Sequence, residues 1–66
     1  MNVAVNGESR EIQTGSTLTE LIAQLALGGK RLAVEINGEI VPRSQYTMVA
    51  LNEGDRIEIV QAIGGG

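Results

Sequence analysis

Large apolar residues stand at every second position over residues 1–5, which is the pattern of a half-buried β-strand. Asn6-Gly7 follows, and this dipeptide is typical of two-residue hairpin turns because both residues tolerate a positive φ. Residues 8–12 are then predicted to return antiparallel, and the Thr-Gly-Ser run at 14–16 ends that strand. The chain is therefore predicted to begin with a β-hairpin.

A short amphipathic helix is predicted next. Thr17 and Glu20 have the spacing of a capping box, in which the hydroxyl and the carboxylate each accept a hydrogen bond from a free backbone N–H. The apolar residues that follow fall on one stripe of the helix: Leu18, Leu21, Ile22 and Leu25. We expect Gly28-Gly29 to end the helix, because glycine adopts the left-handed conformation of a C-cap without strain from a Cβ atom.

A second hairpin is predicted after the glycine pair. Residues 32–36 alternate in polarity, Asn37-Gly38 is a second turn signal, and 39–41 form a short return strand. Pro42 ends that strand because it has no N–H to donate to a neighbouring strand. Residues 43–46 are expected to form an irregular turn or a single helical turn.

The last strand is predicted at 56–60, after a turn at 52–55. One helix between a hairpin and later strands covers one face of a single sheet, which gives a two-layer α+β domain. A right-handed crossover through the helix brings the last strand parallel to the first. This ββαββ arrangement, a mixed sheet with one helix, is the ubiquitin-like β-grasp. We expect the domain to span 1–62, with 63–66 as a flexible C-terminal glycine tail.

Composition excludes several kinds of chemistry. The sequence has no Cys and no His, which excludes a disulfide framework, a Cys/His metal site and a Cys or His nucleophile. A net charge of −3 and a single aromatic residue, Tyr46, argue against nucleic-acid binding. The chain shows no secretory signal and no apolar stretch of the roughly 18 residues that span a membrane. We therefore expect a cytoplasmic protein that contacts neither nucleic acid nor membrane.

The carboxylates offer only weak support for an enzyme. Glu35 and Glu39 flank the second turn and could approach each other as an acid and base pair, but two solvated charges beside a turn are the simpler interpretation. Glu53 and Asp55 lack the ligand spacing of a calcium loop and are interpreted as turn formers. No catalytic residue, metal site or bound cofactor is predicted within the chain itself.

The sequence ends in Gly64-Gly65-Gly66, a tract whose residues have no side chains to pack against the domain. Two interpretations are open. The tract is either a frayed end or expression remnant, or a terminal carboxylate on which another enzyme acts. Glycines suit the second role because they leave the terminal carbonyl unhindered and accept many backbone conformations. Under it the protein is a carrier or substrate rather than an enzyme.

Two segments and the tail carry a resemblance to a known family. The run 33–46, which contains Val-Glu-Ile-Asn-Gly and Val-Pro-Arg, and the run 51–60 both resemble the sulfur carriers of thiamine biosynthesis, the ThiS family. The terminal Gly-Gly of that family is matched by Gly65 and Gly66, and Gly64 is an additional glycine upstream. The likeness extends over nearly the whole chain.

The resemblance implies a mechanism. An activating, E1-like enzyme would adenylate the carboxylate of Gly66 with ATP and Mg²⁺, and sulfur from a cysteine-desulfurase persulfide would convert it to a thiocarboxylate. That thiocarboxylate would then donate sulfur to thiazole synthase during formation of the thiazole ring. The tail, Gly64 to Gly66, would be presented to the active sites of these partners.

Family partners engage the tail and one exposed face of the sheet. Strand alternation places the following residues on that face or at the base of the tail: Ala4, Ala33, Glu58, Val60 and Ile63. A small apolar patch rimmed by charge suits transient docking.

The sequence leaves two alternatives to a carrier for thiazole synthesis, and the second belongs to a different functional class. One is the sulfur-carrier subunit of a molybdopterin synthase, which has the same fold and the same tail chemistry. The other is a non-covalent β-grasp adaptor in which the glycines are incidental. Binding to molybdopterin synthase rather than to thiazole synthase would indicate the first alternative. Unchanged biological activity after deletion of Gly65 and Gly66 would indicate the second.

Overall fold

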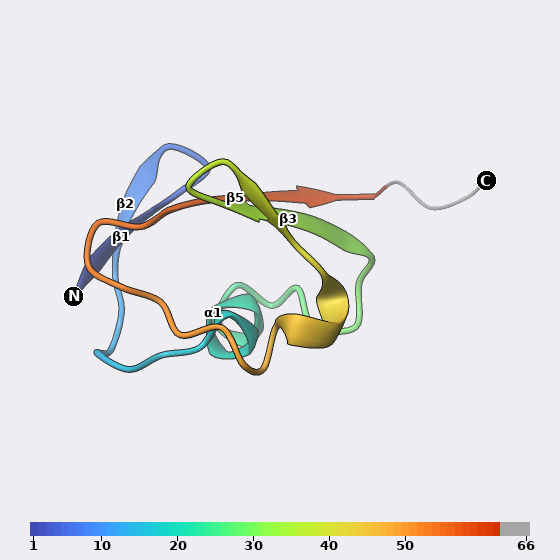
Figure 1. Ribbon diagram of the computed structural model, residues 1–66, viewed down its shortest axis with the longest axis horizontal. Coiled ribbons are helices and arrows are strands. Elements are labelled where there is room, and N and C mark those ends of the chain that lie inside the picture. Colours follow the sequence, from blue (N-terminus) through green and yellow to red (C-terminus); the bar gives the residue numbers. More distant parts are fainter. Residues whose placement is uncertain (63–66) are drawn as a thin grey trace.

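A mixed sheet covered on one face by a helix makes up the protein in the computed structural model, which describes residues 1–62 (Figure 1). The elements in chain order are β1 (Asn2–Val5), β2 (Glu8–Glu11), α1 (Leu18–Gln24), β3 (Leu32–Ile36), β4 (Glu39–Val41), the 3₁₀ turn η1 (Arg43–Gln45) and β5 (Arg56–Gln61). The β-grasp fold predicted from the sequence is confirmed. Of the two forms predicted for residues 43–46, an irregular turn or a single helical turn, the structure has the helical turn. The predicted tail, 63–66, lies outside the described residues.

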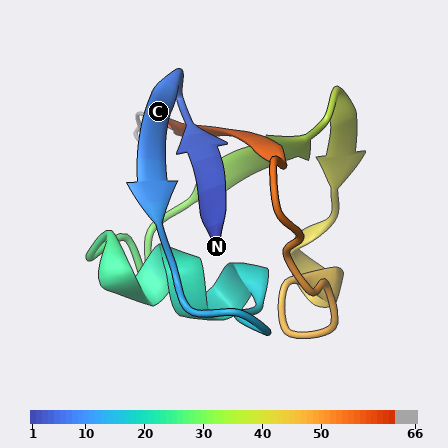
Figure 2. The same ribbon diagram turned by 90° about the vertical axis from the view of Figure 1, so that its left-hand side faces the viewer.

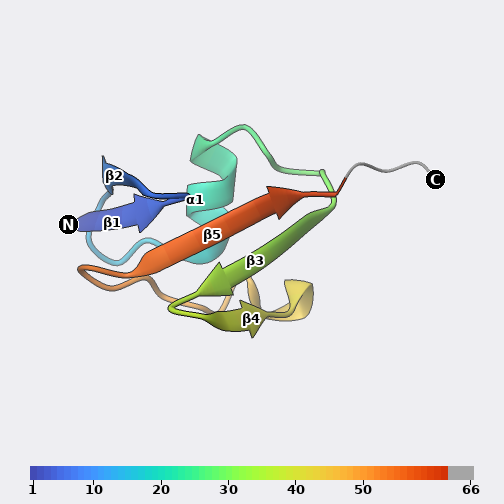
Figure 3. The ribbon, with the colours of Figure 1, turned by 90° about the horizontal axis from the view of Figure 1, so that it is seen from above.

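The strand order is β2-β1-β5-β3-β4 (Figure 3). β1 and β5 run parallel, with Val5 beside Ile57, as the crossover argument predicts. β5 also pairs antiparallel with β3 over five residue pairs. The last strand is therefore the central strand of the sheet, with β3 beside residues 57–61 and β1 beside only its first two residues, Arg56 and Ile57.

Both hairpin turns have the backbone that their sequence predicts. Asn6 and Gly7 have φ values of 51° and 84°, and Asn37 and Gly38 have φ values of 52° and 85°. Two consecutive positive φ angles define a type I′ turn, whose twist matches that of the flanking strands. These turns fix the registers β1–β2 and β3–β4.

The start of α1 contains the predicted capping box. The backbone N–H of Thr17 donates to Glu20 Oε1 at 2.8 Å, and the backbone N–H of Glu20 donates to Thr17 Oγ1 at 3.3 Å. Each side chain thus satisfies a backbone donor that the helix leaves free. Leu18 follows at once and is fully buried.

The predicted end of the helix is wrong. Gly28-Gly29 does not cap it, because α1 ends four residues earlier, at Gln24. Ala26 adopts the left-handed conformation instead, with φ of 58°, and its N–H donates to the carbonyl of Ala23. The N–H of Leu27 donates to the carbonyl of Ile22 at 3.1 Å, which completes a Schellman motif.

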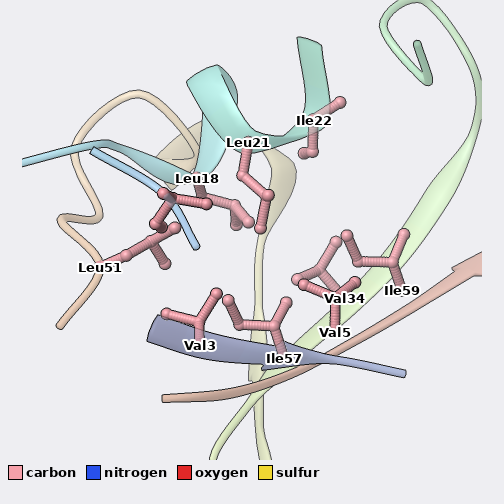
Figure 4. Close-up of a cluster of buried hydrophobic side chains, with 10 residues drawn as sticks. Val3, Val5, Leu18, Leu21, Ile22, Val34, Leu51, Ile57 and Ile59 are labelled. Atoms are coloured by element: carbon pink, nitrogen blue, oxygen red, sulfur yellow. The ribbon is translucent and has the colours of Figure 1, made fainter. Parts of the chain in front are cut away.

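The helix packs on the sheet through an aliphatic core (Figures 2 and 4). Figure 2 shows the strands in one layer, with α1 and η1 together in the other. The most deeply buried side chains come from both layers: Leu18 and Leu21 from α1, Val34 from β3 and Ile57 from β5. In Figure 4 the helical leucines point at the valines and isoleucines of the strands. The opposite face of the sheet has no helix over it within the described residues.

Candidate functional site

The outer face of the sheet carries four of the five residues predicted to form a docking face: Ala4, Ala33, Glu58 and Val60. Ala33 and Val60 are direct partners across β3 and β5, and Val60 is 63% exposed. Ala4 is half-buried and lies on the other side of β5. The structure therefore brings Ala33, Glu58 and Val60 together over β3 and β5. It places Ala4 beside Arg56 on the same face, and it does not describe Ile63. Their role in docking stays a prediction.

Ile40 is a further apolar residue of this face that the sequence analysis did not include. It is 78% exposed and pairs with Glu35 across β3 and β4. The signal was available in the sequence, because the turn at Asn37-Gly38 fixes the register that places Ile40 opposite Glu35. The outer face thus has one apolar pair, Ala33 and Val60, and a separate exposed isoleucine on the edge strand.

Two carboxylates face each other between these apolar residues. Glu35 on β3 and Glu58 on β5 are direct cross-strand partners, and both are exposed. Like charges directly opposite on a sheet repel and lower stability. Arg56 lies two residues before Glu58 on the same face, and it lines a shallow depression together with both glutamates. The outer face therefore combines exposed apolar groups with an acidic centre.

Side chains from the two hairpin turns hold β5 in place. Asn6 accepts a hydrogen bond from the N–H of Ile59 at 2.8 Å and donates Nδ2–H to the carbonyl of the same residue at 3.1 Å. In this way the amide of Asn6 extends the β1–β5 pairing beyond the end of β1. The sequence predicted Asn6 only as a turn residue, and no local pattern indicated this contact.

Asn37 holds the start of the same strand. Its Oδ1 accepts from the N–H of Arg56 at 2.9 Å, and its Nδ2 donates to Asp55 Oδ1 at 3.0 Å. Asp55 is 8% exposed and also accepts the N–H of Asn52 at 2.8 Å. Amides from both turns therefore fix the strand that leads to the C-terminus.

The far end of β5 lies beside the start of β3. Gln61 pairs with Leu32, and the N–H of Ala62 donates to the carbonyl of Arg31 at 2.8 Å. Figure 1 shows this end of β5 at the opposite end of the long axis from the N-terminus. We call this region, Gln61 and Ala62 with Arg31 and Leu32, the tail base. Gly64, Gly65 and Gly66 follow it in sequence and lie outside the described residues.

The structure does not bring together the carboxylates that were considered as an acid and base pair. Glu39 pairs with Ile36, so it lies on the helix side of the sheet, whereas Glu35 lies on the outer face. Glu53 accepts the N–H of Asn2 at 3.0 Å and serves the turn before β5. Within residues 1–62, no three acidic side chains gather into a group that could hold a metal ion.

Helices long and apolar enough to cross a membrane are absent from the part of the chain that the structure describes. The helix α1 has only 7 residues.

Comparison with known proteins identifies relatives over almost the whole chain. The model of the ThiS family matches residues 3–66. The sulfur carrier protein ThiS of Escherichia coli K12 is 35% identical over 66 residues, covering all of both chains. The crystal structure of the thiamine biosynthesis protein ThiS from Geobacter metallireducens superposes with a TM-score of 0.85 at 30% identity, again covering both chains fully.

Larger proteins also contain a similar segment. A thiazole synthase of Paramagnetospirillum magneticum is 46% identical over 66 residues, and one of Magnetococcus marinus is 41% identical over 66 residues. The chain spans about a fifth of the length of these two relatives, 20% of each. The same small domain therefore occurs both as a separate chain and as part of a protein named for thiazole synthesis.

Proposed function

Since the chain belongs to the ThiS family of sulfur carriers for thiamine biosynthesis, we propose that the carboxylate of Gly66 is the group that carries the sulfur. The observation that supports this most strongly is the 35% identity to a sulfur carrier over the full length of both chains. The sequence pattern of the last two residues, Gly-Gly, matches the chemistry required of such an end.

The proposed reaction begins with activation. The Gly66 carboxylate attacks the α-phosphate of ATP in the active site of a partner enzyme, with Mg²⁺ on the phosphates, and pyrophosphate leaves. The product is an acyl-adenylate, in which AMP is a good leaving group. The chain supplies only the attacking oxygen, and the partner supplies the nucleotide and metal.

Sulfur then replaces one carboxylate oxygen. The terminal sulfur of a cysteine persulfide attacks the acyl carbon and expels AMP, which carries the oxygen away. Cleavage of the S–S bond by a second thiol leaves a thiocarboxylate on Gly66 and a disulfide on the partner. The chain has no Cys, so both thiols must belong to partner proteins such as a cysteine desulfurase and the activating enzyme.

Thiazole synthase is the proposed acceptor of this sulfur. Two relatives that contain a similar segment are themselves named thiazole synthase, which supports transfer between domains held close together. In a separate chain, recognition must replace the covalent link. The outer face with Val60, Ala33 and Ile40 around the two glutamates is the surface we propose for that recognition.

Reconstituted thiazole formation tests this function. The chain is combined with activating enzyme, persulfide donor, ATP and thiazole synthase, and the thiazole product is measured. We expect product with the full chain and none after deletion of Gly65 and Gly66. Equal product from the deleted chain would contradict the carrier function, and sulfur delivery to a molybdopterin synthase alone would assign the other pathway.

A further inference from the structure

A groove lies on the helix side of the sheet, between the end of α1 and η1. Its cavity volume is about 260 Å³. The floor is apolar and is formed by Ile22, Leu27, Leu32 and Tyr46, all of which pack on or belong to the core. Leu27, Leu32 and Tyr46 are half-buried, so each of them leaves part of its apolar surface facing the groove.

Backbone contacts hold the walls of this groove in place. The N–H of Thr19 donates to the carbonyl of Tyr46 at 3.2 Å, which ties the start of α1 to the residue after η1. On the other wall, the N–H of Lys30 donates to the carbonyl of Leu27 at 3.2 Å. Ala26, with its positive φ, turns the chain into this wall. A non-glycine residue in this conformation persists only where the surroundings fix it.

The charges around the groove all have one sign. Lys30 and Arg43 line it, both are exposed, and none of its described lining residues is acidic. Arg31, also exposed, is adjacent in sequence. Three of the five basic residues of a chain with net charge −3 thus belong to the segments that border this groove.

The groove adjoins the tail base. Leu32 lines the groove and also pairs with Gln61 at the end of β5. Arg31 follows Lys30 and accepts the N–H of Ala62. Figure 1 shows η1 (gold) and the start of β3 near the end of the molecule toward which β5 runs. A protein that takes hold of the chain beyond Ala62 would therefore meet this groove as well.

We propose that the groove docks a segment of the partner protein that receives the tail, and that this segment presents one apolar side chain flanked by carboxylates. The volume is below the roughly 300–1,000 Å³ of small-molecule sites but suffices for one side chain of a partner. The apolar floor would cover that side chain, and Lys30 and Arg43 would face the carboxylates. This proposal rests on the proposed function in one respect, the identity of the protein that provides the segment.

Opposite charges on the two sides of the tail base would also orient the partner. The outer face has an acidic centre at Glu35 and Glu58, whereas the groove is bordered by cations. Arg56 offsets only one of the two carboxylates, so we expect a partner that surrounds the tail to be basic toward the first surface and acidic toward the second. A partner rotated by half a turn would oppose like charges on both sides, which is unfavourable for binding.

A peptide titration tests the groove directly. The full chain, labelled with ¹⁵N, is titrated with the blocked tripeptide Glu-Leu-Glu and its backbone amide shifts are followed. Burial of one leucine and two exposed ion pairs, less the cost of association and of ordering the peptide, corresponds to a Kd no tighter than about 1 mM. We expect shifts at Lys30, Leu32, Arg43 and Tyr46, and binding at least about 5-fold weaker for the matched tripeptide Gln-Leu-Gln. No shift in these four amides, or shifts centred on Val60, would overturn the proposal.

Charge reversal extends the test to the complete partner. Lys30→Glu combined with Arg43→Glu is compared with Arg10→Glu, an exposed position on β2 outside the groove. Binding to the activating enzyme is expected to weaken about 10-fold or more for the double variant and less than about 2-fold for the control. Equal effects would refute the proposed groove contact. If the groove variant still binds normally while tail deletion abolishes thiazole formation, the carrier function stands and the groove proposal fails.

Discussion

The two faces of the sheet are formed by alternate residues of the same strands, but they differ in burial and charge. The inner face is aliphatic and sealed by α1, with Val34 and Ile57 almost fully buried. The outer face has Val60 exposed and Glu35 directly opposite Glu58. Burial of apolar side chains on the inner face stabilises the fold. The opposed carboxylates of the outer face lower stability, and its exposed apolar side chains are available for contact with a partner. The same substitution should therefore have different consequences on the two faces.

The largest loss of stability is expected from Leu21→Ala. Leu21 has no exposed surface and lies at the centre of the contact between α1 and the sheet (Figure 4). Removing its side chain costs about 2–5 kcal/mol of unfolding free energy through lost burial and a residual cavity. Urea denaturation measures this loss, and Gln24→Ala, at an exposed position of the same helix, is the control. A loss below about 1 kcal/mol for Leu21→Ala would contradict the assigned core.

A matched pair of valines compares the two faces most directly. Val34→Thr places a hydroxyl on the buried face and should lower the unfolding free energy by about 1–3 kcal/mol. Val60→Thr makes the same change on the outer face, and we expect stability to change by less than about 0.5 kcal/mol. Binding of thiazole synthase, measured by calorimetry, should instead weaken for Val60→Thr. Normal binding by Val60→Thr would remove this residue from the docking surface.

Substitution of Asn37 tests the hydrogen bonds that hold the start of β5. Asn37→Gly keeps a residue that accepts the positive φ but removes the hydrogen bonds to Arg56 and Asp55. The expected cost is about 1–2 kcal/mol, because Asp55 is buried and loses one of its donors. Chemical denaturation measures it, with Gly38→Ala as a separate test of turn strain alone. An unchanged stability for Asn37→Gly would show that the turn, and not the side chain, is what matters.

A small gain in stability is expected at the end of α1. Ala26→Gly removes the strain of an L-residue at φ of 58°. Part of that gain is offset by the greater freedom of glycine in the unfolded chain, so the net stabilisation is about 0.5–1 kcal/mol. A shift of the denaturation midpoint to higher urea is the expected result. A shift to lower urea would contradict the left-handed assignment at this residue.

The sequence predicted those parts of the fold that depend on local chemistry. Thr17 and Glu20 predicted the start of the helix, because a capping box is complete within four residues. Asn37-Gly38 predicted both a turn and the register of two strands. The end of the helix was missed because packing of Leu27 on the core, and not the conformational preference of Ala26, decides where α1 stops.

The candidate site was predicted in part. Alternation along the strands placed Ala33, Glu58 and Val60 on one face of the sheet, and the strand registers confirm that placement. The contacts of Asn6 and Asn37 with β5 join residues 53 and 19 positions apart, and no local pattern reports on them. The groove beside the tail base was missed for the same reason, since its walls come from three separate segments of the chain.

Intact mass spectrometry is the most direct test of the claim that the terminal carboxylate carries the sulfur. The chain is incubated with ATP, the activating enzyme and a persulfide donor, and the C-terminal peptide is then sequenced. We predict a mass gain equal to the replacement of one oxygen by sulfur, located on Gly66 and absent without ATP. An unchanged mass under conditions where thiazole is formed, or sulfur located on any other residue, would contradict the account.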